Sequence, residues 1–222
     1  MFSKIFKVVI IGLTFISLFV SANTSKEVFY NGNYYNLSIP EGFCDITDNS
    51  TGKFMKSFLN DSLAKAGGLV SAKVIFSECG KEIDPINLLP WGYVGMGTNK
   101  DVTQRQFNKF TSKNMNSNFM NNLEDIVNKS ANKTLEDYEL SSFGKIEIDM
   151  GKPEVLWSDD NSLIVYVRAS DGNILQDGVF STTVLPKAFV YTYLYDDVKN
   201  NPNILGMASK LNKVAIKNIE SN

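Results

Sequence analysis

Four aromatic residues alternate along one segment near the carboxyl end of this 222-residue sequence: Phe189, Tyr191, Tyr193 and Tyr195. Alternate residues of a β-strand point to the same face, so these rings share one side of one strand. The residues between them are Val190, Thr192 and Leu194, and the opposite side is therefore mostly apolar as well. A strand that is apolar on both sides is covered on both sides. The pattern predicts a central strand of a sheet.

Two interpretations of the aromatic side of this strand stay open. The rings either pack against a helix, as large aromatic side chains commonly do, or they form a wall that contacts a ligand or a partner protein. We therefore take Tyr191 and Tyr193 as candidate contact residues.

Helical and strand-like segments alternate along the rest of the chain. Strand-like alternation occurs in residues 28–39 and 69–78, and again through much of the stretch after residue 146. Residues 51–66 and 203–219 carry apolar side chains at helical spacing. Ser50 or Thr51 is the expected cap of the first of these helices. The order predicts an α+β fold with a largely antiparallel sheet covered by helices.

The first 22 residues have the three-part pattern of an export signal. Lys4 and Lys7 precede an uncharged stretch, residues 8–22, that ends in Val20-Ser21-Ala22. A membrane-spanning helix needs about 20 apolar residues, so cleavage after Ala22 is favoured over a membrane anchor. We expect one exported domain, residues 23–222, that is periplasmic or secreted and has no stable membrane span after cleavage.

The two cysteines of the chain, Cys44 and Cys79, each lie just beyond a strand-like segment. An even pair in an exported protein favours a disulfide, and adjacent strand ends could bring the two residues together. Redox-active pairs usually have C-x-x-C spacing, which is absent here. We predict a structural bridge, whose loop closure stabilises the fold by about 3–4 kcal/mol.

Residues 84–134 are predicted to form an irregular and helical insertion. The part from residue 84 to residue 98 holds two prolines and three glycines around Trp91 and Tyr93, and we expect it to be irregular. It either presents Trp91 and Tyr93 on an exposed loop that contacts a partner or crosses the core as a buried strand.

A helix is expected from about residue 101, but its apolar positions do not keep one phase. Phe107 and Phe110 share one face, whereas the apolar residues after them share another: Met115, Phe119, Leu123, Ile126 and Val127. We expect the helix to break among residues 111–114, or Phe107 and Phe110 to contact something different.

Composition excludes several kinds of chemistry. The chain has no histidine, which excludes Ser-His-Asp and Cys-His catalysis and imidazole metal sites. A formal charge of −2 argues against nucleic acid as a main partner. Asp159 and Asp160 are adjacent, but neighbouring residues in a tight turn point apart, and we interpret them as a solvated hairpin turn. We predict no catalytic residue, no metal and no cofactor.

The order of elements resembles the PsbP-like superfamily. The resemblance rests on the opening hairpin that ends in YNLSIPEGF, residues 35–43, on the helix at 51–66 with the strand after it, and on late hairpins that close in a helix. The nearest thing to a motif is the I-P-x-G-F run. The resemblance implies an α/β/α sandwich, and relatives of this kind are exported, non-enzymatic accessory or binding proteins. It supplies no catalytic residues.

Three functions follow from these observations, in decreasing order of support. The first is an exported accessory or adaptor protein that binds another envelope protein, and it predicts an exposed apolar patch around Trp91 and Tyr93. The second is a module that binds a small molecule or lipid, and it predicts a closed apolar pocket lined by residues such as Tyr191 and Tyr193. The third is a histidine-free hydrolase.

Overall fold

A computed structural model describes residues 25–81, 90–114, 117–139, 149–170 and 175–222; the expected export signal, residues 1–22, lies outside them. The described strands are β1 (Ser25–Tyr30), β2 (Asn33–Ser38), β3 (Phe43–Asp45), β4 (Val70–Glu78), β5 (Trp91–Thr98), β6 (Asp149–Met150), β7 (Glu154–Ser158), β8 (Leu163–Ser170), β9 (Leu175–Leu185) and β10 (Ala188–Asp197). The helices are α2 (Ser50–Lys65), α3 (Gln104–Asn114), α4 (Ser117–Asp137), the 3-10 turn η2 (Val198–Asn200) and α5 (Ile204–Glu220).

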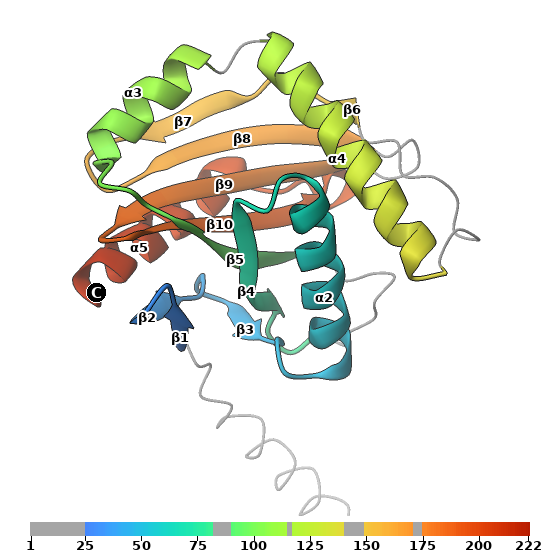
Figure 1. The fold of residues 1–222 in the computed structure, drawn as a ribbon, viewed down its shortest axis with the longest axis horizontal. Helices are drawn as coiled ribbons and strands as arrows, with labels where there is room; N and C mark the ends of the chain where they lie inside the picture. The colour runs from blue at the N-terminus through green and yellow to red at the C-terminus, as the bar shows by residue number, and fades with distance from the viewer. Residues whose placement is uncertain (1–24, 82–89, 115–116, 140–148, 171–174) are drawn as a thin grey trace, which may run out of the picture.

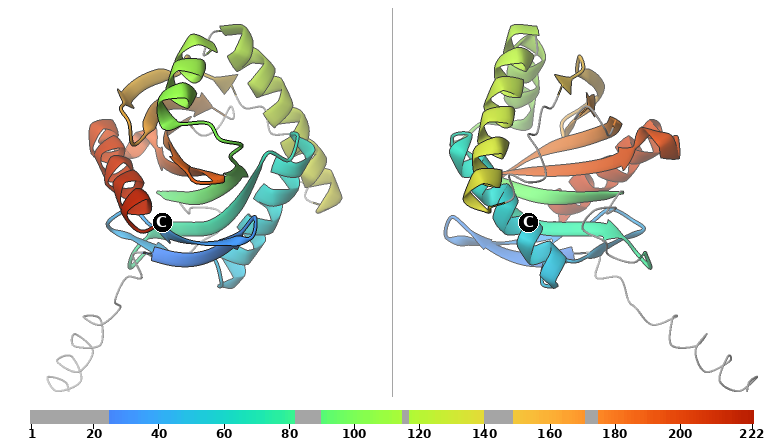
Figure 2. Two further views of the ribbon diagram at one scale, coloured as in Figure 1. Left: turned by 60° about the vertical axis from the view of Figure 1, so that its left-hand side comes forward. Right: turned by 90° about the vertical axis from the view of Figure 1, so that its right-hand side faces the viewer.

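Eight of these strands form one antiparallel sheet in the order β3-β4-β5-β10-β9-β8, with β6 and β7 both paired to β8. Helices α2, α3 and α4 lie on one face of the sheet, and α5 lies on the other (Figures 1 and 2). The separate β1–β2 hairpin packs on the α5 side, where Tyr35 and Leu37 join the main core with Leu211. The α+β sandwich is therefore confirmed, and β10 is a central strand as predicted.

The first helix begins one residue before its predicted start. The cap is Asn49, whose side-chain oxygen accepts a hydrogen bond from the Gly52 amide at 2.7 Å. Ser50 and Thr51, which we expected to cap the helix, instead lie in its first turn. The helix ends at Lys65, before Gly67 and Gly68, whose φ values of +117° and +66° favour glycine.

The second helical region consists of two helices in the described residues: α3 ends at Asn114, and α4 begins at Ser117. Residues 111–114, where we expected the break, lie in the last turn of α3, so the expected position of the break is wrong. The alternative, that Phe107 and Phe110 contact something different, holds for Phe107, whose ring centroid lies 5.4 Å from that of Phe189.

The expectation of an irregular segment at 84–98 is wrong for residues 91–98. These residues form β5, which pairs with β4 on one side and with β10 on the other, and so belong to the centre of the main sheet. The three glycines made the segment resemble a loop. They are accommodated because large side chains of neighbouring strands occupy the space that side chains at these positions would fill.

The predicted disulfide joins Cys44 to Cys79, with Cα atoms 5.1 Å apart. Strand β3 pairs with the end of β4, where Cys44 faces Ser77, and the Cys79 amide donates to the Gly42 carbonyl at 3.0 Å. The bridge therefore holds the edge strand β3 against β4. Within the described residues, no helix is long and apolar enough to span a membrane.

Candidate binding site

Helices α2 and α3 lie over a row of aromatic rings on β5 and β10: Trp91, Tyr93, Phe189, Tyr191, Tyr193 and Tyr195. Because β10 pairs with β5, Tyr193 lies opposite Tyr93, and Tyr195 lies opposite Trp91. The Tyr93 and Tyr193 rings stack with centroids 4.5 Å apart, and those of Trp91 and Tyr195 are 5.3 Å apart. The aromatic side of β10 is thus continued across β5.

Glycines give these rings their space. A Cβ on Gly178 of β9, opposite Tyr195, would lie 3.2 Å from the Tyr195 ring. A Cβ on Gly97 of β5 would lie 3.3 Å from the Tyr191 ring and 2.8 Å from the Leu69 carbonyl. Each tyrosine ring can therefore lie flat across the neighbouring strand, which explains why a strand as glycine-rich as β5 is stable beside β10.

The structure brings together the four residues that we singled out as contact candidates, but it also covers much of them. Tyr93 is only 6% exposed. Trp91 and Tyr193 are half-buried and pack against the same buried cluster, which includes Tyr93, as Met55 and Leu59 of α2 do. Trp91 and Tyr93 lie in a sheet strand rather than on an exposed loop. Of the two interpretations of the aromatic face, packing against a helix is the correct one for the end of the face that lies under α2.

The buried hydroxyls at this end are not suited to proton transfer at neutral pH. Burial raises the pKa of Tyr93 well above its usual value, and hydrogen bonds with Tyr193 and Tyr195 raise it further. Burial likewise raises the pKa of Tyr193 and Tyr195. All three phenols are therefore protonated at neutral pH and serve as packing and hydrogen-bonding groups.

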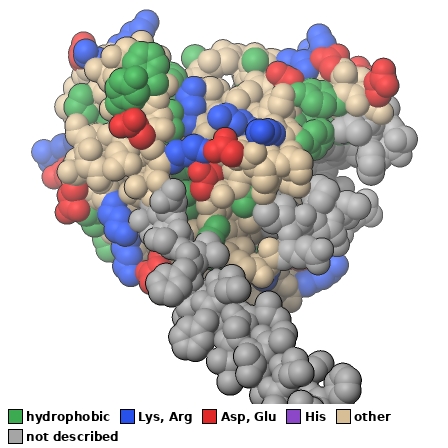
Figure 3. Space-filling view, turned by 90° about the horizontal axis from the view of Figure 1, so that it is seen from below, with side chains coloured by type: hydrophobic (Ala, Val, Ile, Leu, Met, Phe, Trp, Pro, Cys, Tyr) green, Lys and Arg blue, Asp and Glu red, His purple; other side chains and the backbone are tan. Residues whose placement is uncertain are grey.

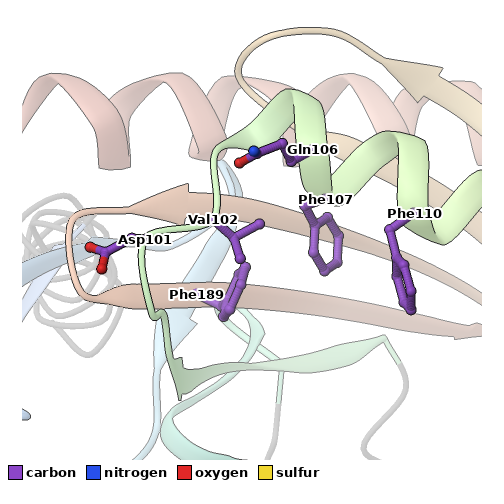
Figure 4. A pocket seen from close by; sticks show the side chains of 6 residues that line it. All are labelled: Asp101, Val102, Gln106, Phe107, Phe110 and Phe189. Atoms are coloured by element: carbon purple, nitrogen blue, oxygen red, sulfur yellow. The ribbon is translucent and has the colours of Figure 1, made fainter.

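The other end of the aromatic row opens into a hollow. Phe189 of β10 contacts Tyr191, with centroids 6.1 Å apart, and also Phe107 of α3 at 5.4 Å. Together with Phe110 these residues line a hollow of about 550 Å³, whose remaining walls are Asp101, Val102 and Gln106. In Figure 4 the three phenylalanine rings lie along one stretch of it, and Asp101 lies apart from them.

Phe110 marks the mouth of this hollow, because its side chain is 68% exposed. Helix α3 is anchored beside it by Gln104, which donates to the Thr182 carbonyl at 3.2 Å and accepts from the Val184 amide at 2.7 Å. Gln106 caps the helix start by accepting from the Thr103 amide at 2.9 Å. The apolar surface is therefore held on a fixed helix.

Sequence reasoning did not identify this hollow. Phe107 and Phe110 were noted only because their phase differed from that of the following helix. That difference in phase was the signal in the sequence, since apolar residues on two faces of a helical segment indicate two separate packing surfaces.

A second hollow, of about 440 Å³, lies on the α5 side near the disulfide. Its walls include Phe43, Met207 and Lys210, and the Lys210 ammonium lies 5.3 Å from the centroid of the Phe43 ring. Charges of both signs border it: Lys81, Lys210, Glu78 and Asp196. Lys81 and Glu78 form an ion pair at 2.5 Å, which makes this a neutralised surface.

One carboxylate of the acidic pair at the β7–β8 turn, that of Asp159, holds the turn together. The Asp159 carboxylate accepts from Trp157 Nε1 at 2.7 Å and from the amides of Asn161 and Ser162, both at 2.8 Å. Burial alone would raise the pKa of Asp159, but these hydrogen bonds outweigh it and lower the pKa. Asp159 is a turn-forming carboxylate, and in the described residues no group of three or more acidic or cysteine side chains could hold a metal.

Ser62 and Lys65 of α2 have the S-x-x-K spacing of some serine hydrolases. The Lys65 ammonium lies 2.7 Å from the Asp137 carboxylate and donates to Thr134 Oγ1 at 3.1 Å. A lysine held in this way is a paired cation. It is not available as the free amine that a Ser-Lys mechanism requires.

No protein-family model and no curated protein matches this chain. Among solved structures it is similar to the solution structure of cyanobacterial PsbP (CyanoP) from Synechocystis sp. PCC 6803, with 12% identity and a TM-score of 0.39 over 90% of this chain and 94% of that one. It is also similar to a single-residue mutant of the protein Mog1, with 9% identity and a TM-score of 0.34 over 89% of this chain and 94% of that one. These are distant likenesses of fold alone, and we transfer no activity or partner from them.

Proposed function

We propose that this chain is an exported, non-enzymatic accessory protein that binds another protein of the cell envelope, and that the hollow beside α3 is where it binds. The single observation that carries this proposal is Phe110, exposed at the mouth of a hollow lined by Phe107 and Phe189. Rigid aromatic side chains next to a concavity are the usual anchors of protein interfaces.

The same observation favours a protein over a small molecule. Sites for small ligands enclose roughly 70–90% of the ligand surface. The hollow beside α3 has a largely exposed phenylalanine as part of its wall, so a small ligand there would keep much of its surface in water. A protein surface can cover Phe110 and fill the hollow together.

Site-specific photo-crosslinking tests this proposal. Benzoylphenylalanine replaces Phe110 in the full chain, which is expressed with its own leader, and irradiation is followed by mass spectrometry of the products. The control places the same group at Leu205 of α5, which is 73% exposed on the other face of the sheet.

We expect a protein adduct from position 110 in the envelope fraction and none from position 205. A lipid or small-molecule adduct at position 110 would favour the ligand-binding function instead. Retention of the chain in the cytoplasm, or an absence of any adduct, would contradict the proposal.

A further inference from the structure

The outer surface of α3 carries basic side chains and no acidic one of its own. Arg105, Lys109 and Lys113 recur at every fourth residue, so they follow one stripe along the helix. All three are exposed, and α3 contains no Asp or Glu. Among the described residues, none of the three takes part in an ion pair. We call this stripe the basic ridge.

The basic ridge borders the hollow. Gln106 and Phe110, which line it, each follow directly after a member of the ridge, Arg105 and Lys109. Phe110 also lies three residues before Lys113, which places it on the adjoining helix face. The carboxylate of the hollow, Asp101, lies apart from the phenylalanines (Figure 4). An occupant that reaches Phe110 therefore meets cations along the neighbouring side of the helix.

The basic ridge contrasts with the net charge of the chain and with the face of the molecule seen from below. The chain has a formal charge of −2, and on the face seen from below, basic and acidic side chains lie intermixed (Figure 3). Like charges four residues apart weaken a helix, so three of them without a partner are costly to α3. A partner of opposite charge would remove that cost, since charge complementarity selects and orients partners at the rim of an apolar contact.

From this juxtaposition we infer that the occupant of the hollow is an acidic protein segment, which inserts an apolar side chain among Phe107, Phe110 and Phe189 and places carboxylates along Arg105, Lys109 and Lys113. This inference rests on the proposed function, because it names the chemistry of the partner that binds at the same hollow. A lipid membrane fits less well, since a flat surface does not fill a concavity.

Charge reversal on the crosslinking background tests the inference. The variant K109E/K113E carries benzoylphenylalanine at position 110. The matched control K213E/K217E has the same spacing and the same change of net charge on exposed positions of α5. Circular dichroism and thermal unfolding establish that both variants are folded.

We expect the adduct yield to fall at least tenfold in K109E/K113E and to stay unchanged in K213E/K217E. The captured peptide should hold an excess of Asp and Glu around an apolar residue, and raising NaCl from about 0.05 M to about 0.5 M should lower the yield, because salt screens exposed charges. The same protein captured equally by both variants, or a captured peptide without acidic excess, would overturn the inference and leave the proposed function standing. If the chain with benzoylphenylalanine at position 110 and no charge reversal gives no protein adduct, both the inference and the proposed function are contradicted.

Discussion

At three strand edges in the described residues, the side-chain amide of an Asn or Gln makes the hydrogen bonds that the backbone of a neighbouring strand would otherwise make. Asn60 accepts from the Ala72 amide at 2.7 Å and donates to the Ala72 carbonyl at 3.3 Å, beyond the end of β3. Asn222 makes the same two bonds to Asn36 of β2, and Gln104 bonds to β9. An amide has both a donor and an acceptor, so it satisfies an exposed strand edge as a backbone would.

This role predicts the effect of Asn60→Asp. A carboxylate keeps the hydrogen bond from the Ala72 amide but cannot donate to the Ala72 carbonyl. Its second oxygen would instead face that carbonyl oxygen, and two acceptors repel each other. We expect a loss of about 1–3 kcal/mol in the free energy of unfolding at neutral pH, measured by urea denaturation. Asn33→Asp, at the first residue of β2, removes an exposed hydrogen bond from Asn33 to the Asn31 carbonyl and should cost less because water replaces the lost bond. Equal costs would contradict the edge-capping role.

The glycines of β5 are predicted to differ in their tolerance of a methyl group. A Cβ on Gly92 would lie 2.0 Å from the Tyr193 carbonyl and 2.5 Å from the Phe76 ring, whereas one on Gly95 would first meet Val70 Cγ1 at 2.9 Å. A backbone carbonyl in a central strand pair cannot move aside, but the end of a valine side chain can. We expect Gly92→Ala to cost 1–3 kcal/mol or more, about the cost of overpacking a core, and clearly more than Gly95→Ala. Chemical denaturation of the two variants checks the order, and a reversed order would show that β5 packs differently.

At the scale of whole elements, the sequence predicted an element correctly where the spacing of its apolar residues matches the surfaces that it packs against. The alternation of Phe189 to Tyr195 predicted a central strand, and β10 is one. The segment that forms β5 was expected to be irregular because its glycines have low β-propensity by themselves. A buried strand that carries Trp91 and Tyr93 stayed open as the alternative, and the structure shows that alternative. The stability of β5 depends on rings from β10, more than 90 residues further along the chain, and such a long-range fit is not visible in a local pattern.

The same limit applies to the candidate site. Trp91, Tyr93, Tyr191 and Tyr193 were predicted to contact a partner or a ligand, and that role stays a prediction. How far α2 covers them depends on the path of that helix across the sheet, which the sequence does not reveal. Phe107 and Phe110 lie on a different helix face from the apolar residues after them, and this difference indicated that they contact something else. The hollow itself arises from the meeting of α3 with Phe189 of β10, which no single segment encodes.

The edge of the sheet at β3 yields a prediction about the disulfide. Strand β3 has three residues, and Cys44–Cys79 holds it to β4. Reduction, or the double variant Cys44→Ala with Cys79→Ala, should lower the free energy of unfolding by about 3–4 kcal/mol, the loop-closure value for a span of this length. Urea denaturation with and without a reductant measures it. Identical midpoints for the oxidised and reduced protein would contradict this stabilising role.

On the scale of the whole molecule, the tyrosines of the aromatic row make the free energy of unfolding depend on pH. Burial raises the pKa of Tyr93, Tyr191, Tyr193 and Tyr195 in the folded protein, whereas a tyrosine of the unfolded chain ionises near pH 10, its usual pKa. The unfolded state therefore releases these protons first. The stabilising contribution is complete below about pH 10 and is lost as the pH rises above it.

We therefore expect cooperative alkaline unfolding in which these four phenols ionise together as the sheet opens. The rise of phenolate absorbance that they contribute should coincide with loss of the near-ultraviolet circular dichroism. Tyr193→Phe removes one of the four groups and should make stability fall less steeply with pH above 10. A single gradual rise of phenolate absorbance with native dichroism retained would show that the rings are open to solvent, and with it that α2 does not cover the row.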